Sequence, residues 1–185
     1  RIVQGGWHFD DSAVVDDEVM AKILEVAPLA PLHNYGEAAA IEYCREKYPE
    51  LPNVAVFDTS FFQTIPPKAY MYPLPYELYE KHAIRKYGAH GTSHEFISSV
   101  VPGVIGKPAE GLKQIVLHIG NGASASAEVS GKPVETSMGL TPLEGLMMGG
   151  RTGDIDPAVV FHLIRNAHMN VDLSLIHISE PTRPY

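Results

Sequence analysis

QIVLHIGNGASASAEV, residues 114–129, is the stretch that decides the fold. Residues 114–119 are strand-like, and residues 123–129 alternate small or apolar with polar side chains. The Gly-Asn-Gly sequence between them can supply the positive φ angles of a tight turn, so we predict a β-hairpin. Backbone N–H groups at such a tip can approach an anion because glycine has no side chain to intrude, and Asn121 and Ser124 add hydrogen-bonding groups. The tip is therefore either a phosphate-binding turn or only a turn.

Strands and helices alternate upstream of this hairpin. We expect a strand at residues 1–3, helices at residues 16–26 and 37–48, a proline-containing loop at 27–34 and a buried strand at 54–57. This alternation indicates an α/β fold.

Nearer the hairpin, residues 66–79 are rich in proline and aromatic side chains, and we expect a stiff connector there between two domains. Thr92 followed by Glu95 fits a capping box, which predicts a helix over residues 93–101. A last helix is expected at residues 156–166.

Composition excludes several functional classes. The chain has 185 residues, 45% of them hydrophobic, and 22 acidic against 14 basic side chains, for a formal net charge of -8. No basic stripe suits a nucleic acid or an anionic membrane, and no apolar run approaches a membrane span. The single cysteine, Cys44, fits a buried small hydrophobe in a helix better than a nucleophile. We expect no nucleic-acid or membrane partner and a cytoplasmic location.

Three further segments carry candidate chemistry. In residues 138–157 one arginine, Arg151, lies among glycines, where it could grip a phosphoryl group or pair with Asp154 or Asp156. His90 precedes a predicted helix start, where an imidazole could stabilise transition-state charge.

Metal binding is the rival role for His90, since His94 lies four residues later. Gly91 and the predicted cap argue against a shared helical face, and the glutamate of a His-Glu-x-x-His motif is missing, so we predict no metal ligands in this chain. Asp58 ends the strand predicted at 54–57. It could order a magnesium-bound phosphate, position a nucleophile, or merely cap the following segment.

Taken together, these segments resemble the acetate kinase family of the acetate and sugar kinase, Hsc70 and actin superfamily. NVAVFDTSFFQTIPP, YGAHGTSH, HIGNGAS and TSMGLTPLEGLMMGGRTGDIDP occur in the family's order and at about its spacing. The resemblance runs from Arg1 to about Met169. It implies a ribonuclease H-like/actin-like ATPase core, with residues 1–60 closing the first, acyl-substrate domain and residues 61–172 beginning the second, nucleotide-binding domain.

The resemblance also implies roles for individual residues. Asp58, His90 and Arg151 match the family's catalytic residues. Arg1 matches a substrate arginine. Apolar Val3, Leu32 and Pro142 would line the acyl pocket, with His33 nearby. The ATP-phosphate loop would comprise His118, Ile119, Gly120, Asn121 and Gly122.

The activity implied by the resemblance is transfer of the γ-phosphoryl of ATP to acetate or propionate, giving acetyl phosphate and ADP, with Mg²⁺ and in a homodimer. Because a carboxylate is already nucleophilic, such an enzyme chiefly aligns it and neutralises the phosphoryl group. The alternatives are a kinase for a longer acid, such as butyrate kinase, and a non-catalytic phosphate- or nucleotide-binding fragment.

This sequence departs from the family at Gln4, Trp7, Phe62 and Ala89. At Ala89 the family has an aromatic residue in the acyl pocket, so a methyl here predicts room for a longer acid, at about 0.8 kcal/mol per buried methylene. The family's first phosphate loop would precede Arg1, and its adenosine and magnesium residues would follow Met169. We therefore expect an inactive fragment, whose residues 173–185 resemble a translated sequencing adapter.

Overall fold

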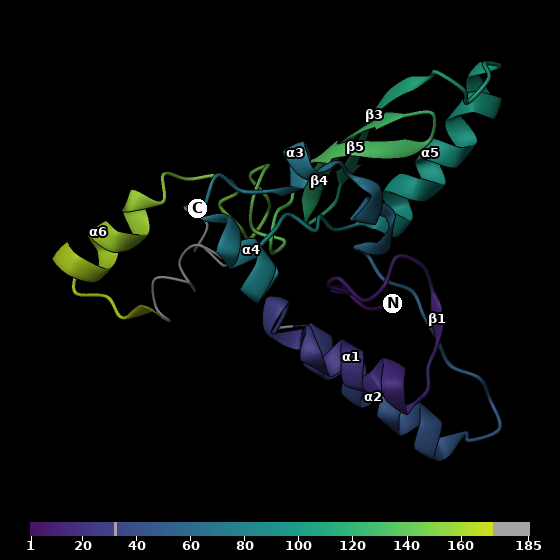
Figure 1. Cartoon of the computed structure of the whole chain (residues 1–185), viewed down its shortest axis with the longest axis horizontal. Coiled ribbons are helices and arrows are strands. Elements are labelled where there is room, and N and C mark those ends of the chain that lie inside the picture. Colours follow the sequence, from purple (N-terminus) through teal and green to yellow (C-terminus); the bar gives the residue numbers. More distant parts are fainter. Residues whose placement is uncertain (32, 172–185) are drawn as a thin grey trace.

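The computed structural model describes residues 1–31 and 33–171 (Figure 1). The substrate residue expected at Leu32 and the tail at 173–185 lie outside this range. The helices that are described include none long and apolar enough to cross a membrane.

The first part of the chain contains a short two-stranded sheet, an isolated β-bridge and two helices. Strand β1 (Ala13–Val14) pairs antiparallel with β2 (Val54–Ala55), and Ile2 forms a parallel bridge with Phe57. The strand predicted at 1–3 is thus reduced to a single bridge, in which Ile2 donates to the Val56 carbonyl at 2.7 Å. Asp58 is held at the end of this bridge, because its N–H donates to the Ile2 carbonyl at 2.9 Å.

Helices α1 (Asp17–Glu25) and α2 (Asn34–Lys47) pack against each other and confirm the two helices expected from sequence (Figure 1). Asp16 caps α1 by accepting a hydrogen bond from the Val19 N–H at 2.8 Å. Helix α2 begins three residues earlier than predicted. The proline-containing loop between the helices includes one short 3-10 turn, η1 (Ala27–Leu29).

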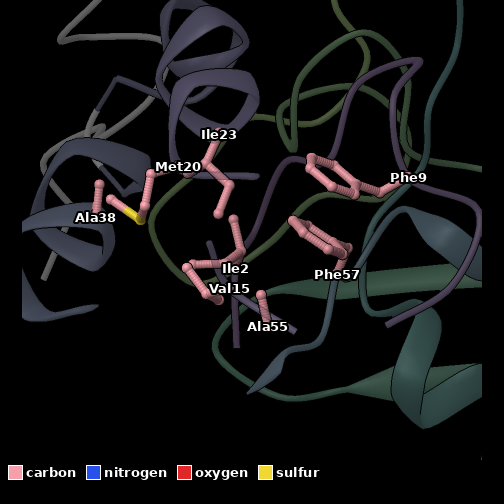
Figure 2. Packing of buried hydrophobic residues seen from close by; sticks show 8 residues of the cluster. All are labelled: Ile2, Phe9, Val15, Met20, Ile23, Ala38, Ala55 and Phe57. Carbon is pink, nitrogen blue, oxygen red and sulfur yellow. The ribbon is translucent and has the colours of Figure 1, made fainter. Parts of the chain in front are cut away.

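A compact apolar core joins these elements (Figure 2). Phe57 is fully buried and stacks on Phe9 with ring centroids 4.0 Å apart. Ile2, Val15 and Ile23 pack in the same cluster. Burying a side chain of this size stabilises the fold by about 1.5–3 kcal/mol. The core therefore fixes the strand end that carries Asp58.

The segment expected to be a stiff connector is partly helical. After η2 (Ser60–Thr64), it forms α3 (Pro67–Tyr70) and α4 (Tyr76–His82). Pro67 is the first residue of α3, where the fixed φ of proline suits a first helical turn, and Pro75 is the N-cap residue of α4. Arg85, after α4, lies 3.8 Å from the centre of the Tyr70 ring. This cation–π contact ties the segment together.

The predicted hairpin is confirmed and extended by a third strand. The sheet has the order β3-β4-β5, comprising β3 (Lys113–Ile119), β4 (Ala123–Val129) and β5 (Lys132–Thr136), all antiparallel. Helix α5 (Gly91–Ile105) packs along this sheet (Figure 1). Helix α6 (Ala158–Asn166), expected from sequence, lies away from the sheet.

The two faces of the sheet differ strongly. Ser124, Ser126 and Glu128 of β4 are buried, whereas Ile115, Leu117 and Ile119 of β3 are 61–78% exposed. Large exposed apolar surfaces are unusual for a protein that stands alone.

Two local predictions are wrong. The capping box at Thr92 does not form, because α5 begins at Gly91 with His90 as its N-cap residue, in the left-handed region at φ 61°. Neither Gly120, Asn121 nor Gly122 has a positive φ, so the hairpin turn does not need glycine for that reason.

Candidate active site

The site begins with an ion pair at the end of the Phe57 bridge. Nε of Arg1 lies 3.5 Å from Oδ2 of Asp58. The Asp58 side chain is buried and that of Arg1 is 60% exposed, so the guanidinium extends from the carboxylate toward solvent. Burial raises the pKa of Asp58 above its ordinary value, and the positive charge of Arg1 opposes this rise.

Asp58 also fixes the start of α5. Its carbonyl accepts a hydrogen bond from the Gly91 N–H at 2.8 Å, and its Oδ1 lies 3.5 Å from the Thr92 hydroxyl. A Cβ on Gly91 would lie 2.3 Å from the Asp58 carbonyl oxygen, so only glycine permits this approach. The contact brings the first part of the chain to the N-terminal end of α5.

His90 occupies a strained backbone position at this junction. Its left-handed φ is uncommon for a residue with a side chain, and such strain concentrates at functional sites. The imidazole stacks on His118 with ring centroids 4.1 Å apart, and its Nδ1 is hydrogen-bonded to the Ser124 hydroxyl at 2.8 Å.

The tip of the hairpin meets both His90 and Arg151. A Cβ built on Gly122 would lie 3.2 Å from Cε1 and Nε2 of His90 and 3.4 Å from Nη1 of Arg151. Glycine is therefore needed here for close approach. Three predicted site residues from separate segments converge at this point.

Arg151 is held by neutral groups. Its Nη1 donates to the Pro142 carbonyl at 2.9 Å and lies 3.5 Å from the Met148 sulfur. The proposed partners Asp154 and Asp156 instead accept from the backbone N–H groups of Gly145 and Ala158. Within the described part of the chain, no ion pair neutralises Arg151, so its charge is available to an anion.

A backbone contact joins the arginine segment to the hairpin tip. The Asn121 carbonyl accepts from the Gly149 N–H at 3.1 Å. Asn121 itself is exposed. The two glycine-rich segments singled out in the sequence therefore lie against each other.

The remaining predicted site residues lie at varied places. Val3 is buried, with its N–H donating to Oε2 of Glu37 at 2.9 Å. Pro142 is half-buried and contributes its carbonyl to Arg151. His118 faces α5, where its Nδ1 is hydrogen-bonded to the Ser93 hydroxyl at 3.0 Å. Ile119 is 70% exposed and points away from that face.

The surroundings of the site lower the pKa of two histidines, His90 and His94. The pKa of His90 is lowered to about 4, chiefly by burial, and then by His118, His94, Arg151 and Arg1. Burial, followed by His118, also lowers the pKa of His94 to about 4. Both imidazoles are therefore neutral at pH 7 in the structure as described, and His90 can accept a proton when an anion binds.

Sequence reasoning missed a set of buried polar residues behind His90. His94 was considered only as a metal ligand, but its Nε2 is hydrogen-bonded to the same Ser124 hydroxyl at 2.8 Å. Its Nδ1 is bonded to Ser126 at 2.7 Å, and Ser126 donates to Glu128 Oε1 at 2.7 Å. The available signal was the every-second spacing of Ser124, Ser126 and Glu128 on one strand face.

Within the described part of the chain, no group of three or more His, Cys, Asp or Glu residues is arranged to hold a metal ion. His90 and His94 share a serine hydroxyl as their common partner.

Comparison with known proteins adds independent information. The profile of the Acetokinase family matches residues 1–177. An acetate kinase of Desulfitobacterium hafniense is 54% identical over 172 residues, covering 93% of this chain and 43% of that protein. An acetate kinase of Clostridium botulinum is 55% identical over the same length and shares of each chain. The chain thus spans less than half the length of these relatives.

Solved structures agree with the sequence matches. A propionate kinase from Francisella tularensis superposes with a TM-score of 0.94 at 43% identity, over 98% of this chain and 47% of that one. An acetate kinase from Porphyromonas gingivalis gives a TM-score of 0.90 at 41% identity, over 98% and 46%. This likeness confirms the predicted α/β class, as the part of an actin-like ATPase fold that these residues supply.

Proposed function

Since the chain belongs to the acetokinase family, we propose that its protein transfers the γ-phosphoryl group of ATP to acetate or propionate, giving an acyl phosphate and ADP. The observation that carries the proposal is the convergence of His90, Gly122 and Arg151 at one point. A cytoplasmic location and a homodimer belong to the same proposal.

A phosphoryl group fits this point chemically. Gly122 lets the hairpin tip come close to both the imidazole and the guanidinium, and Arg151 has no carboxylate partner in the described chain. A planar guanidinium suits phosphate because it can donate two parallel hydrogen bonds. Arg151 and His90 would then neutralise charge on the transferring group, which is the main requirement of phosphoryl transfer.

Arg1 and Asp58 would serve the acceptor. Acetate is ionised at pH 7 and needs no general base, so Asp58 has no proton to remove from it. Its ion pair with Arg1 instead orients a guanidinium whose exposed end can bind the acyl carboxylate. We therefore assign Asp58 the role of positioning Arg1 and the start of α5, and Arg1 the role of holding the acceptor.

Mg²⁺ is expected by the family resemblance, where it would screen the phosphate charges. The described residues offer it no ligand cluster, and Asp58 is already paired with Arg1.

Acyl length is the finer part of the proposal. Ala89 is buried, 2% exposed, immediately before His90, at the position where the resemblance expects an aromatic residue. The smaller side chain favours acceptance of propionate or a longer acid.

The test is acyl phosphate formation, trapped with hydroxylamine, by a version of the protein completed to the length of its relatives (the completed protein). Arg151→Ala should lower turnover by about 100-fold or more, as loss of charge stabilisation in such reactions does. Arg165→Ala, an exposed arginine on α6, is the matched control. Nucleotide binding without hydroxamate formation would instead support the non-catalytic alternative.

A further inference from the structure

A line of buried hydrogen bonds runs from His90 to a carboxylate inside the sheet. It consists of His90, Ser124, His94, Ser126 and Glu128, and we call it the histidine–serine chain. His94, Ser124, Ser126 and Glu128 are each at most 2% exposed. Water therefore does not compete for these bonds, and their direction is set by the groups themselves.

The carboxylate end fixes the direction of every bond. Ser126 donates its single hydroxyl hydrogen to Oε1 of Glu128, so its oxygen must accept from Nδ1–H of His94. A neutral imidazole with hydrogen on Nδ1 has a bare Nε2, which can only accept. Ser124 therefore donates to Nε2 of His94, and its oxygen accepts from Nδ1–H of His90.

We propose that Glu128, acting through Ser126, His94 and Ser124, is a positioning residue that holds His90 with hydrogen on Nδ1 and Nε2 bare toward Gly122 and Arg151. Nε2 is one of the two ring atoms that a Cβ on Gly122 would contact at 3.2 Å. This inference rests on the proposed function only in naming a phosphoryl group as the partner of Nε2.

The fixed direction has a chemical consequence. When an anionic phosphoryl group raises the proton affinity of His90, the proton adds at Nε2, and Nδ1–H keeps its bond to Ser124. No hydroxyl has to rotate, because the imidazolium and this neutral tautomer use the same chain. The opposite tautomer would need both serine hydroxyls reversed and a hydrogen on Glu128.

Glu128 itself is costly in its position. It lies on the buried face of β4, and in the described chain its Oε2 has no hydrogen-bond partner and no cation forms an ion pair with it. A buried carboxylate with one hydrogen bond is less favourable than an apolar side chain of the same size. A buried charge at this position has a use if it orients the histidine–serine chain that ends at His90.

Nitrogen-15 NMR of the imidazoles in the completed protein tests this directly. We expect His90, identified by loss of its signals in His90→Asn, to carry hydrogen on Nδ1 and not on Nε2 at pH 7. Ser126→Ala and Glu128→Leu each cut the chain, and either should introduce the Nε2–H tautomer of His90. Ser99→Ala and Glu95→Leu, at exposed positions of α5, should leave it unchanged.

Turnover supplies the second measurement. Ser126→Ala and Glu128→Leu should each lower kcat roughly 10- to 100-fold, which is the usual effect of removing a partner that orients a histidine. The KM for the carboxylate should change little. Hydrogen on Nε2 of His90 in the unmutated protein, or an unchanged tautomer in Ser126→Ala, would overturn the proposal. If no acyl phosphate forms but the spectra behave as expected, the proposed function fails and the orienting role of Glu128 stands.

Discussion

Replacing Gly122 by alanine tests the convergence at the hairpin tip. The new Cβ would lie 3.2 Å from His90 and 3.4 Å from Arg151, tighter than ordinary contact, so the neighbours must move by about 0.3 Å. Displacing a catalytic group by 1 Å lowers the rate by about 100-fold. If the logarithm of the rate falls in proportion to the displacement, a shift of about 0.3 Å lowers the rate roughly fourfold. The loss is larger if the methyl also occupies the phosphate position. The backbone at Gly122 is not left-handed, so alanine strains nothing locally.

The assay is hydroxamate formation by the completed protein, with thermal unfolding measured in parallel. Gly36→Ala on α2 is the control, since its Cβ would meet nothing within 4 Å. We expect Gly122→Ala to lower kcat at least fourfold more than Gly36→Ala, with both variants folded at the assay temperature. Equal turnover of the two variants would refute the close approach of the tip to His90 and Arg151.

Two further predictions concern substrate size and pH. Ala89→Phe should shift the substrate preference toward acetate. Each methylene of the acid that no longer fits should cost about 0.8 kcal/mol, or roughly fourfold in kcat/KM. Equal kcat/KM ratios for acids of increasing length in the variant and the unmutated protein would contradict this prediction. Burial lowers the pKa of His90 and His94 to about 4. Between pH 6.5 and about 4 these two side chains are therefore protonated in the unfolded chain but not in the folded chain. The free energy of unfolding should fall as the pH falls through this window. The raised pKa of Asp58 acts oppositely, losing its stabilising contribution as pH rises through that pKa. Urea titrations of the completed protein at pH 7 and pH 5 measure the net slope, and His94→Gln should flatten it.

The elements predicted best were those whose pattern is local. Helix α1 has an acidic cap and a spaced apolar face, and the hairpin has alternating strands around a Gly-Asn-Gly tip, so short-range physics specifies both. The wrong predictions have tertiary causes. Thr92 does not cap α5 because Gly91 is drawn against the Asp58 carbonyl, which forces His90 into the left-handed region.

The candidate site divides in the same way. Motifs identified Asp58, His90 and Arg151 one by one, but their spacing left open whether Arg151 pairs with a neighbouring aspartate. The fold answered this by placing the guanidinium against the Pro142 carbonyl and the hairpin tip. Long-range proximity of this kind depends on how α5 packs on the sheet, which no single segment encodes.

The sequence by itself determined the family, the α/β class and the residue types that can handle a phosphoryl group, because these are carried by ordered local motifs. Only the tertiary structure placed Gly122 and Glu128 relative to His90. Gly122 is small because two side chains from distant segments approach it, and the buried charge of Glu128 reaches His90 only through hydroxyl and imidazole groups that two separate elements bring into line. Hydrogen-bond direction depends on the complete set of partners, and that set exists only in the folded chain.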